Sequence, residues 1–131
     1  MNVPSNLKYT KSDEWFDSAN GAAGITDYAQ NQLSDIVFVE LLVDEGETVE
    51  VGKPIASVES VKASAEIYAP ASGTVSAVNK GLADKPETLN SDPVGEGWMI
   101  KIAGGNAGEV MDADAYTADC DGRAHEPVIS K

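Results

Sequence analysis

The chain has 131 residues, a length typical of a single domain with one core. Its 22 acidic and nine basic residues give a net charge of −13, which disfavours binding to nucleic acids or anionic membrane surfaces. One cysteine, Cys120, and one histidine, His125, exclude an internal disulfide framework and any mechanism that needs two imidazoles. Because 42% of the residues are apolar but only 6% are aromatic, we expect a β-rich fold with a core of small aliphatic side chains.

The N-terminal segment Met1–Thr10 has no apolar run of signal-peptide length, and no stretch approaches the ~18 apolar residues of a membrane span. We therefore expect a soluble, intracellular protein. Its compartment would be the cytoplasm of a bacterium, or the mitochondrial matrix if this is a processed eukaryotic chain.

The first regular element in chain order is a predicted short helix at Thr26–Leu33. Thr26 is a favourable N-cap residue and Asp27 places an acid in the first turn. Ala29 and Leu33, four residues apart, then share one face of the helix.

Short apolar and β-branched runs separated by turn residues follow the helix, which is typical of a β-sandwich or barrel with antiparallel neighbours. The predicted strands lie at Asp35–Leu41, Thr48–Val51, Pro54–Val58, Ala63–Ala69, Gly73–Val78 and Trp98–Ile102. The long segment Lys80–Gly97, rich in proline and glycine, is predicted to be turn-like.

A second helix is predicted near Glu109–Asp119. Asn106 is its expected cap, because Glu109 follows three residues later, and Gly122 is its expected stop. We expect one domain over residues 1–131, with a core at about 7–119 and a flexible tail at 122–131.

The acidic run Asp112–Asp121 has oxygen-rich spacing but fails the test for a calcium loop. Such a loop would need an oxygen ligand at Tyr116, glycine at Thr117 and a bidentate acid at Arg123. A solvated helix face explains the run better. Cys120 is interpreted as a small apolar side chain and not a nucleophile, and His125 as a solvated surface residue.

Lys62 is the strongest candidate for chemistry. It lies between two predicted strands, and the connection Val61-Lys62 contains none of the residues that tolerate a positive φ at tight hairpin tips. Lys62 should project from the tip. A lysine in that position is ordinarily a solvated charge, so geometry alone assigns it no function.

The stretch Glu59-Ser60-Val61-Lys62-Ala63 resembles the lipoyl-attachment motif of glycine cleavage H proteins, and the flanking Val51–Pro54 and Ala69–Val75 resemble its surroundings. The resemblance covers about residues 7–119 and is highly specific. A biotin carrier would have methionine on both sides of the lysine, and an acyltransferase lipoyl domain more often has aspartate before it. Further matching segments are Leu7-Lys8-Tyr9, Asp13-Glu14-Trp15, Gly24–Gln30, Asp35–Leu41, Leu89-Asn90, Pro93 and Gly97–Ile102. Two departures are Asp13, where the family usually has histidine, and Ser34, where it usually has glycine.

The resemblance implies a mainly β barrel-sandwich hybrid with short peripheral helices, and a non-catalytic carrier with lipoic acid amide-linked to Lys62. Its partners would be the glycine decarboxylase (P protein), the aminomethyltransferase (T protein), the dihydrolipoamide dehydrogenase (L protein) and a lipoylating enzyme. The carrier would shuttle an aminomethyl group and reducing equivalents among them. The loaded arm carries an amine that the resemblance places in a cleft of the carrier itself, where Glu14 and Glu66 are candidate neighbours.

Two alternatives stay open. A related scaffold could relay lipoate to other proteins or serve another pathway, and a β binding domain could have kept the fold with Lys62 unmodified. The mass of the intact protein after exposure to a lipoylating enzyme separates the second alternative from a carrier.

Overall fold

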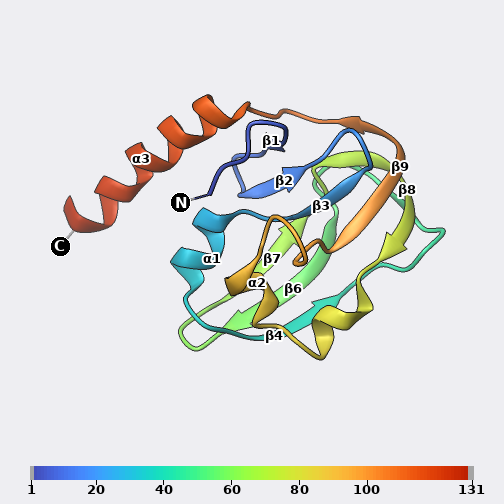
Figure 1. The fold of residues 1–131 in the computed structure, drawn as a ribbon, viewed down its shortest axis with the longest axis horizontal. Coiled ribbons are helices and arrows are strands. Elements are labelled where there is room, and N and C mark those ends of the chain that lie inside the picture. Colours follow the sequence, from blue (N-terminus) through green and yellow to red (C-terminus); the bar gives the residue numbers. More distant parts are fainter. Residues whose placement is uncertain (1, 130–131) are drawn as a thin grey trace.

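The computed structural model describes residues 2–129, and its strands form two antiparallel sheets (Figure 1). The larger sheet has the order β1-β2-β3-β9-β8-β5 and the smaller has the order β4-β6-β7. The elements are β1 (Lys8–Tyr9), β2 (Glu14–Phe16), β3 (Ala22–Ile25), α1 (Asp27–Leu33), β4 (Ile36–Leu41), β5 (Thr48–Val49), β6 (Pro54–Ser60), β7 (Ser64–Tyr68), β8 (Ala71–Val78), the 3-10 helix η1 (Lys80–Ala83), α2 (Thr88–Ser91), β9 (Ile100–Ala107) and α3 (Ala113–Ile129).

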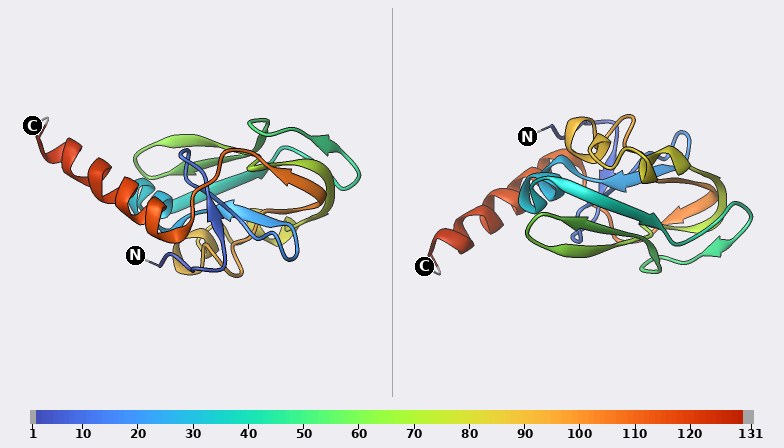
Figure 2. Two further views of the ribbon diagram at one scale, coloured as in Figure 1. Left: turned by 90° about the horizontal axis from the view of Figure 1, so that it is seen from above. Right: turned by 90° about the horizontal axis from the view of Figure 1, so that it is seen from below.

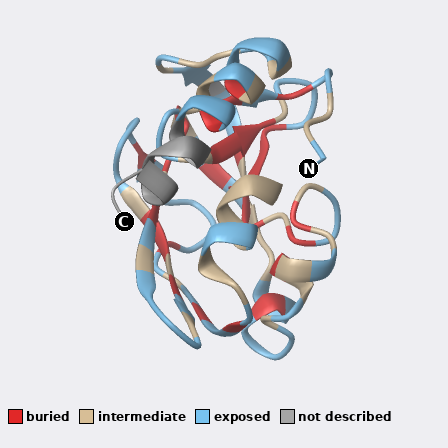
Figure 3. Ribbon diagram, turned by 90° about the vertical axis from the view of Figure 1, so that its left-hand side faces the viewer, coloured by how far each residue is buried: buried red, intermediate tan, exposed pale blue. Residues whose placement is uncertain are grey.

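The two sheets pack face to face into a flattened body (Figure 2), and the main core lies between them (Figure 3). Val39, Val58 and Ile67 reach this core from the smaller sheet, and Val75 and Ile100 reach it from the larger. Apart from Phe16 and Met99, the buried positions of this core are aliphatic, as the low aromatic content predicts. This arrangement is the predicted barrel-sandwich hybrid.

A second, smaller core lies where α3 begins against the N-terminal strands. It contains Tyr9, Trp15, Tyr116 and Cys120, so most of the buried aromatic side chains gather here, whereas Phe16 belongs to the main core. Cys120 is 1% exposed, in agreement with its interpretation as an apolar side chain. From this contact α3 extends past the β body (Figure 1).

Helix α1 forms where the sequence predicts it. The Thr26 hydroxyl accepts a hydrogen bond from the Ala29 amide at 3.1 Å, which satisfies one of the free N–H groups of the first turn. Ala29 and Leu33 pack against the main core. The helix ends at Ser34, whose φ of 67° lies in a region that favours glycine.

The C-terminal helix differs from the prediction at both ends. Asn106 is not its cap but lies in β9, paired with Ser72 of β8. Helix α3 starts at Ala113, and the Asp112 carboxylate caps it by accepting the Ala115 amide at 2.8 Å. The predicted stop at Gly122 is also wrong, because one glycine lowers helix stability by only about 1 kcal/mol and does not by itself end a helix.

Two regions contain helices or strands that the sequence analysis did not predict. The segment Lys80–Gly97 contains η1 and α2, and the sequence pattern did not separate strands β1, β2 and β3 from loops. These strands have two to four residues, too few to display a period of two, and Ala22–Ile25 contains alanine and glycine, which are poor strand formers. Within the described residues, none of the helices combines the length and the apolar character needed to span a bilayer.

Candidate functional site

Lys62 occupies the tip of the β6–β7 hairpin. The pairing of Glu59 with Ser64 continues into a backbone hydrogen bond of 2.7 Å from the Ser60 amide to the Ala63 carbonyl, which leaves Val61 and Lys62 as the connecting residues. Lys62 is exposed, and Val61 before it is 67% exposed. The hairpin therefore presents this lysine to solvent, as the sequence predicts.

The Ser60 side chain explains why the tip needs no glycine or asparagine. Its hydroxyl oxygen accepts the amides of Lys62, at 3.3 Å, and Ala63, at 3.0 Å, and lies 3.1 Å from the Ala63 carbonyl, to which it donates. Asp13 and Ser34 are the non-glycine residues with positive φ in the described chain, so the tip has ordinary dihedral angles. A side-chain hydroxyl thus replaces the backbone acceptor of a standard two-residue hairpin.

Strand β4 supports the base of the hairpin. Ile36 pairs with Ser60, and the Val61 amide donates to the Asp35 carbonyl at 3.0 Å. These contacts hold the tip from one side, and the other motif residues, Glu59 and Ala63, are exposed. The motif therefore combines a fixed backbone with accessible side chains.

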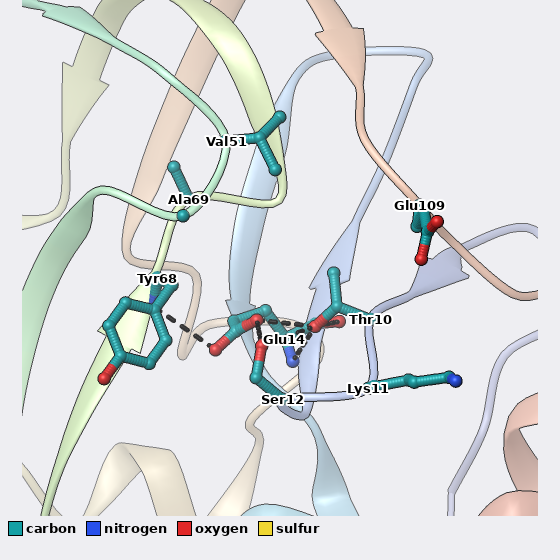
Figure 4. Close-up of a pocket in the computed structure, with 9 residues that line it drawn as sticks. Thr10, Lys11, Ser12, Glu14, Val51, Tyr68, Ala69 and Glu109 are labelled. Atoms are coloured by element: carbon teal, nitrogen blue, oxygen red, sulfur yellow. Dashed lines mark hydrogen bonds between the residues drawn. The ribbon is translucent and has the colours of Figure 1, made fainter.

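A cleft of about 530 Å³ opens between the two sheets. Residues 10–13, here called the cleft loop, join β1 to β2. The polar lining comes largely from Thr10, Lys11 and Ser12 of this loop and from Glu14, the first residue of β2. The lining residues are Thr10, Lys11, Ser12, Glu14, Val51, Gly52, Tyr68, Ala69 and Glu109 (Figure 4).

Glu14 is the buried ionisable group of this cleft, with an exposed fraction of 1%. Its Oε1 accepts the hydroxyls of Thr10 and Ser12, each at 2.5 Å, and its Oε2 accepts the backbone amide of Tyr68 at 3.2 Å. A carboxylate offers about four lone-pair sites, so one acceptor position on Oε2 is left for another donor.

The Glu14 carboxylate lies in an environment that disfavours its charge. Burial raises its pKa above the ordinary value, and the hydrogen bonds from Ser12, Thr10 and Tyr68 oppose that rise. The nearby charge of Asp13 raises the pKa further. Lys11 lines the same cleft, but its ammonium group points away from Glu14 (Figure 4). A cation that entered the cleft would therefore stabilise the ionised form of Glu14.

Glu66 lies outside the set of residues that line the cleft. It is exposed in the middle of β7, where it pairs with Ser57 of β6. Because side chains alternate along a strand, Glu66 lies on the same face of β7 as Ser64 and Tyr68. The structure therefore brings Glu14 into the cleft and leaves Glu66 between the cleft and the hairpin tip.

The sequence analysis missed Thr10, Ser12 and Tyr68 as partners of Glu14. The two hydroxyl residues precede Glu14 by four and two positions. This spacing is a local signal that could have indicated a carboxylate held by hydrogen bonds from its own loop. Tyr68 had no such signal, because its amide meets Glu14 only across the gap between the two sheets.

Among the described residues, no group of three His, Cys, Asp or Glu side chains is arranged so that it could hold a metal ion. Within the acidic run, Asp112 serves as the helix cap and Asp114 and Asp121 are exposed on α3.

The fold and the site together define a class: a barrel-sandwich hybrid domain of the carrier type, with a lysine displayed at a hairpin tip. A crystal structure of a glycine cleavage system H protein from Mycobacterium marinum is similar to it, with a TM-score of 0.82 and 37% identity. The match covers 88% of this chain and 97% of that one.

Sequence comparisons agree with this class. Glycine cleavage system H proteins from Psychrobacter sp. and Cronobacter sakazakii are 49% and 50% identical to the chain. The matches cover 90% and 89% of this chain and 98% and 95% of those proteins. The family profile described as Glycine cleavage H-protein matches residues 7–121. The chain belongs to this family, whose members are lipoyl carriers.

Proposed function

We propose that this chain carries lipoic acid on Lys62 and shuttles an aminomethyl group and reducing equivalents in glycine cleavage. It would visit the glycine decarboxylase, the aminomethyltransferase and the dihydrolipoamide dehydrogenase in turn. The observation that carries the proposal is the exposed Lys62 at a hairpin tip fixed by Ser60. When attached, the lipoyl group supplies a disulfide that accepts the aminomethyl group and is later returned as a dithiol.

The chain's own contribution is presentation and storage. The hairpin offers the Lys62 amine to a lipoylating enzyme and keeps the arm away from the core. Tethering then raises the effective concentration of the arm at each partner's active site. The acidic surface, with a net charge of −13, would speed encounters with basic rims on those partners.

We also propose that Glu14 holds the amine cargo between visits. Its carboxylate is buried, hydrogen-bonded on three sides and open to one further donor. Tyr68 lies six positions after Lys62 in the chain, a span of at most about 20 Å at ~3.3 Å per strand residue. That span is of the same order as a lysine side chain lengthened by a lipoyl group. Glu66, exposed on this face of β7, would lie along the path.

The attachment site is tested by mass spectrometry of the intact protein after reaction with a lipoylating enzyme and lipoate, followed by peptide mapping. We expect one lipoyl group, on Lys62. Lys62→Arg keeps the charge but offers no amine that can be acylated, and should stay unmodified. Lys53→Arg, which alters another exposed lysine in a turn, is the matched control and should react like the parent. An unmodified parent would support the binding-domain alternative, and a lipoyl group on another lysine would refute the assignment.

The cargo role of Glu14 is tested on lipoylated protein loaded from glycine by the decarboxylase and then isolated. Glu14→Gln should leave lipoylation of Lys62 unchanged but release the amine cargo faster than the parent. Glu66→Gln measures the contribution of the exposed carboxylate on the path, which should be smaller because water screens it. Equal release from the parent and Glu14→Gln would remove Glu14 from the mechanism.

Transfer between partners separates the glycine cleavage role from a lipoate relay. The lipoylated chain should support glycine oxidation when the three other components are supplied. A chain that instead passes its lipoyl group to other acceptors, and does not support glycine oxidation, would favour the relay alternative.

A further inference from the structure

Two hydrogen bonds, one buried and one part-buried, connect α3 to α1 and to the loop beside Glu14. The Tyr116 hydroxyl lies 2.6 Å from the Thr26 hydroxyl and donates to the Asp13 carboxylate at 2.9 Å. Because the Tyr116 hydroxyl uses its one hydrogen to donate to Asp13, the Thr26 hydroxyl is the donor in the bond between Thr26 and Tyr116. Tyr116 therefore links the first turn of α3, the N-cap of α1 and the last residue of the cleft loop.

Asp13 holds an unusual backbone conformation at this point. Its φ is 74°, which few non-glycine residues adopt, although aspartate is among those that tolerate it best. Two backbone hydrogen bonds fix the residue: its amide donates to the Thr10 carbonyl at 3.2 Å, and its carbonyl accepts the Thr26 amide at 3.0 Å. The bond from Tyr116 fixes the side chain as well.

The same short loop supplies two of the three hydrogen-bond donors to the cleft carboxylate. Thr10 and Ser12 donate to Glu14, and Asp13 is its neighbour in the chain. A change in the position of Asp13 would therefore shift the donors that orient Glu14 together with Glu14 itself.

The attachment of α3 does not depend on the Tyr116 hydroxyl alone. The Tyr116 ring stacks on Tyr9 with centroids 4.8 Å apart, and the backbones of Tyr9 and Met111 exchange hydrogen bonds of 2.9 and 2.6 Å. Removal of the hydroxyl would keep the stacking and this backbone bridge, so its role can be isolated from the packing of the helix.

We propose that Tyr116 is a positioning residue for Glu14, so that the start of α3 is a working part of the cleft. Its hydroxyl locks the carboxylate of Asp13, which sets the cleft loop and thereby the direction in which Glu14 faces the amine cargo. This inference rests on the proposed role of Glu14 in holding that cargo.

The first test uses the unlipoylated protein and the Tyr68 amide. Tyr68 pairs with Pro54, which has no N–H, and its own N–H donates to Glu14 Oε2. The chemical shift of this amide in a ¹H–¹⁵N spectrum therefore reports on the position of the carboxylate. Tyr116→Phe should shift the Tyr68 amide, although residue 68 lies in the other sheet.

Tyr9→Phe is the matched control, because it also deletes one phenol hydroxyl from the same stacked pair. The Tyr9 hydroxyl donates to the Pro4 carbonyl at 2.6 Å and does not bond to the cleft loop. Tyr9→Phe should therefore leave the chemical shift of the Tyr68 amide unchanged. An unmoved Tyr68 amide in Tyr116→Phe, or equal shifts in the two tyrosine variants, would overturn the proposal.

The second test measures release of the amine cargo in a double-mutant cycle. Tyr116→Phe should speed release at least about twofold, the lower end of coupling between residues of one hydrogen-bond network, and should have no effect in a Glu14→Gln background. An unchanged rate in the single variant, or an equal acceleration in both backgrounds, would refute the positioning role. If Glu14→Gln itself does not change release, the proposed function of Glu14 fails instead, and the amide shift still reports whether Tyr116 positions its carboxylate.

Discussion

Ser60→Ala tests whether the hairpin must be closed for Lys62 to be modified. The Ser60 hydroxyl accepts two amides and donates to one carbonyl within the tip. A neutral hydrogen bond contributes a net ~0.5–1.5 kcal/mol, and at an exposed site water replaces much of it, so we expect a total loss of about 1 kcal/mol. That loss lowers the ratio of closed to open tip by about fivefold.

The assay is the initial rate of Lys62 lipoylation at limiting enzyme, followed by intact mass, together with urea unfolding of each variant. Ser60→Ala should react up to about fivefold more slowly than the parent and should lose about 1 kcal/mol or less of unfolding free energy. Ser64→Ala is the matched control. This exposed serine lies on β7, and within the described residues no hydrogen bond to its hydroxyl is found, so both quantities should stay at the parent value.

Ser60→Thr restores a hydroxyl at the same position and should recover most of the lost rate. If Ser60→Ala is lipoylated as fast as the parent, the side-chain turn is not needed for recognition, and the argument from hairpin closure is wrong. If Ser60→Ala is slow and Ser60→Thr equally slow, the enzyme recognises serine itself and not the turn.

Two further predictions concern stability. Because burial raises the pKa of Glu14, the folded state holds its proton more tightly than the unfolded state, and parent stability should fall as pH rises from below the ordinary glutamate pKa to above the raised one. A rise of one in the pKa of Glu14 corresponds to about 1.4 kcal/mol of unfolding free energy. Urea unfolding over a pH series should show this loss of stability in the parent and not in Glu14→Gln. Parallel stability curves for the two proteins would contradict the prediction. Ser34 has φ 67° and ψ −150°, a region used almost only by glycine, so Ser34→Gly should raise the free energy of unfolding by about 1 kcal/mol. A lower melting temperature for Ser34→Gly would show that the serine is not strained.

The sequence predicted the parts of the fold in which side-chain alternation reports burial directly. In β7, Ile67 is buried while the preceding Glu66 is exposed, so the alternation of apolar and polar residues in the sequence matches the alternation of buried and exposed positions in the strand. The same reasoning identified β6 and the hairpin tip between the two strands. Helix α1 was predictable because its cap, Thr26, is a local signal.

The cleft could not be predicted in the same way, because it joins segments that are distant in sequence. The Tyr68 amide and the Glu14 carboxylate are 54 residues apart, and Tyr116 and Asp13 are 103 residues apart. The resemblance gave Glu14 and Glu66 equally as candidate neighbours of the amine. Only the strand pairing of the folded chain shows that Glu14 is buried and Glu66 is exposed. The resemblance marked Asp13 only as a departure from the family's usual histidine, and nothing in the sequence indicates that this aspartate accepts a hydrogen bond from a buried phenol.

The position of Glu14 relates the stability of the fold to its function. Strand β7 is an edge of the smaller sheet, and a free edge amide invites pairing with other chains. Glu14 covers this edge from the larger sheet by accepting the Tyr68 amide. A neutral acceptor could do the same without the penalty of a buried charge, which the raised pKa of Glu14 records. The proposed role of Glu14 in holding a cationic cargo would account for a carboxylate at this position, because closure of the sheet edge alone needs only a neutral acceptor.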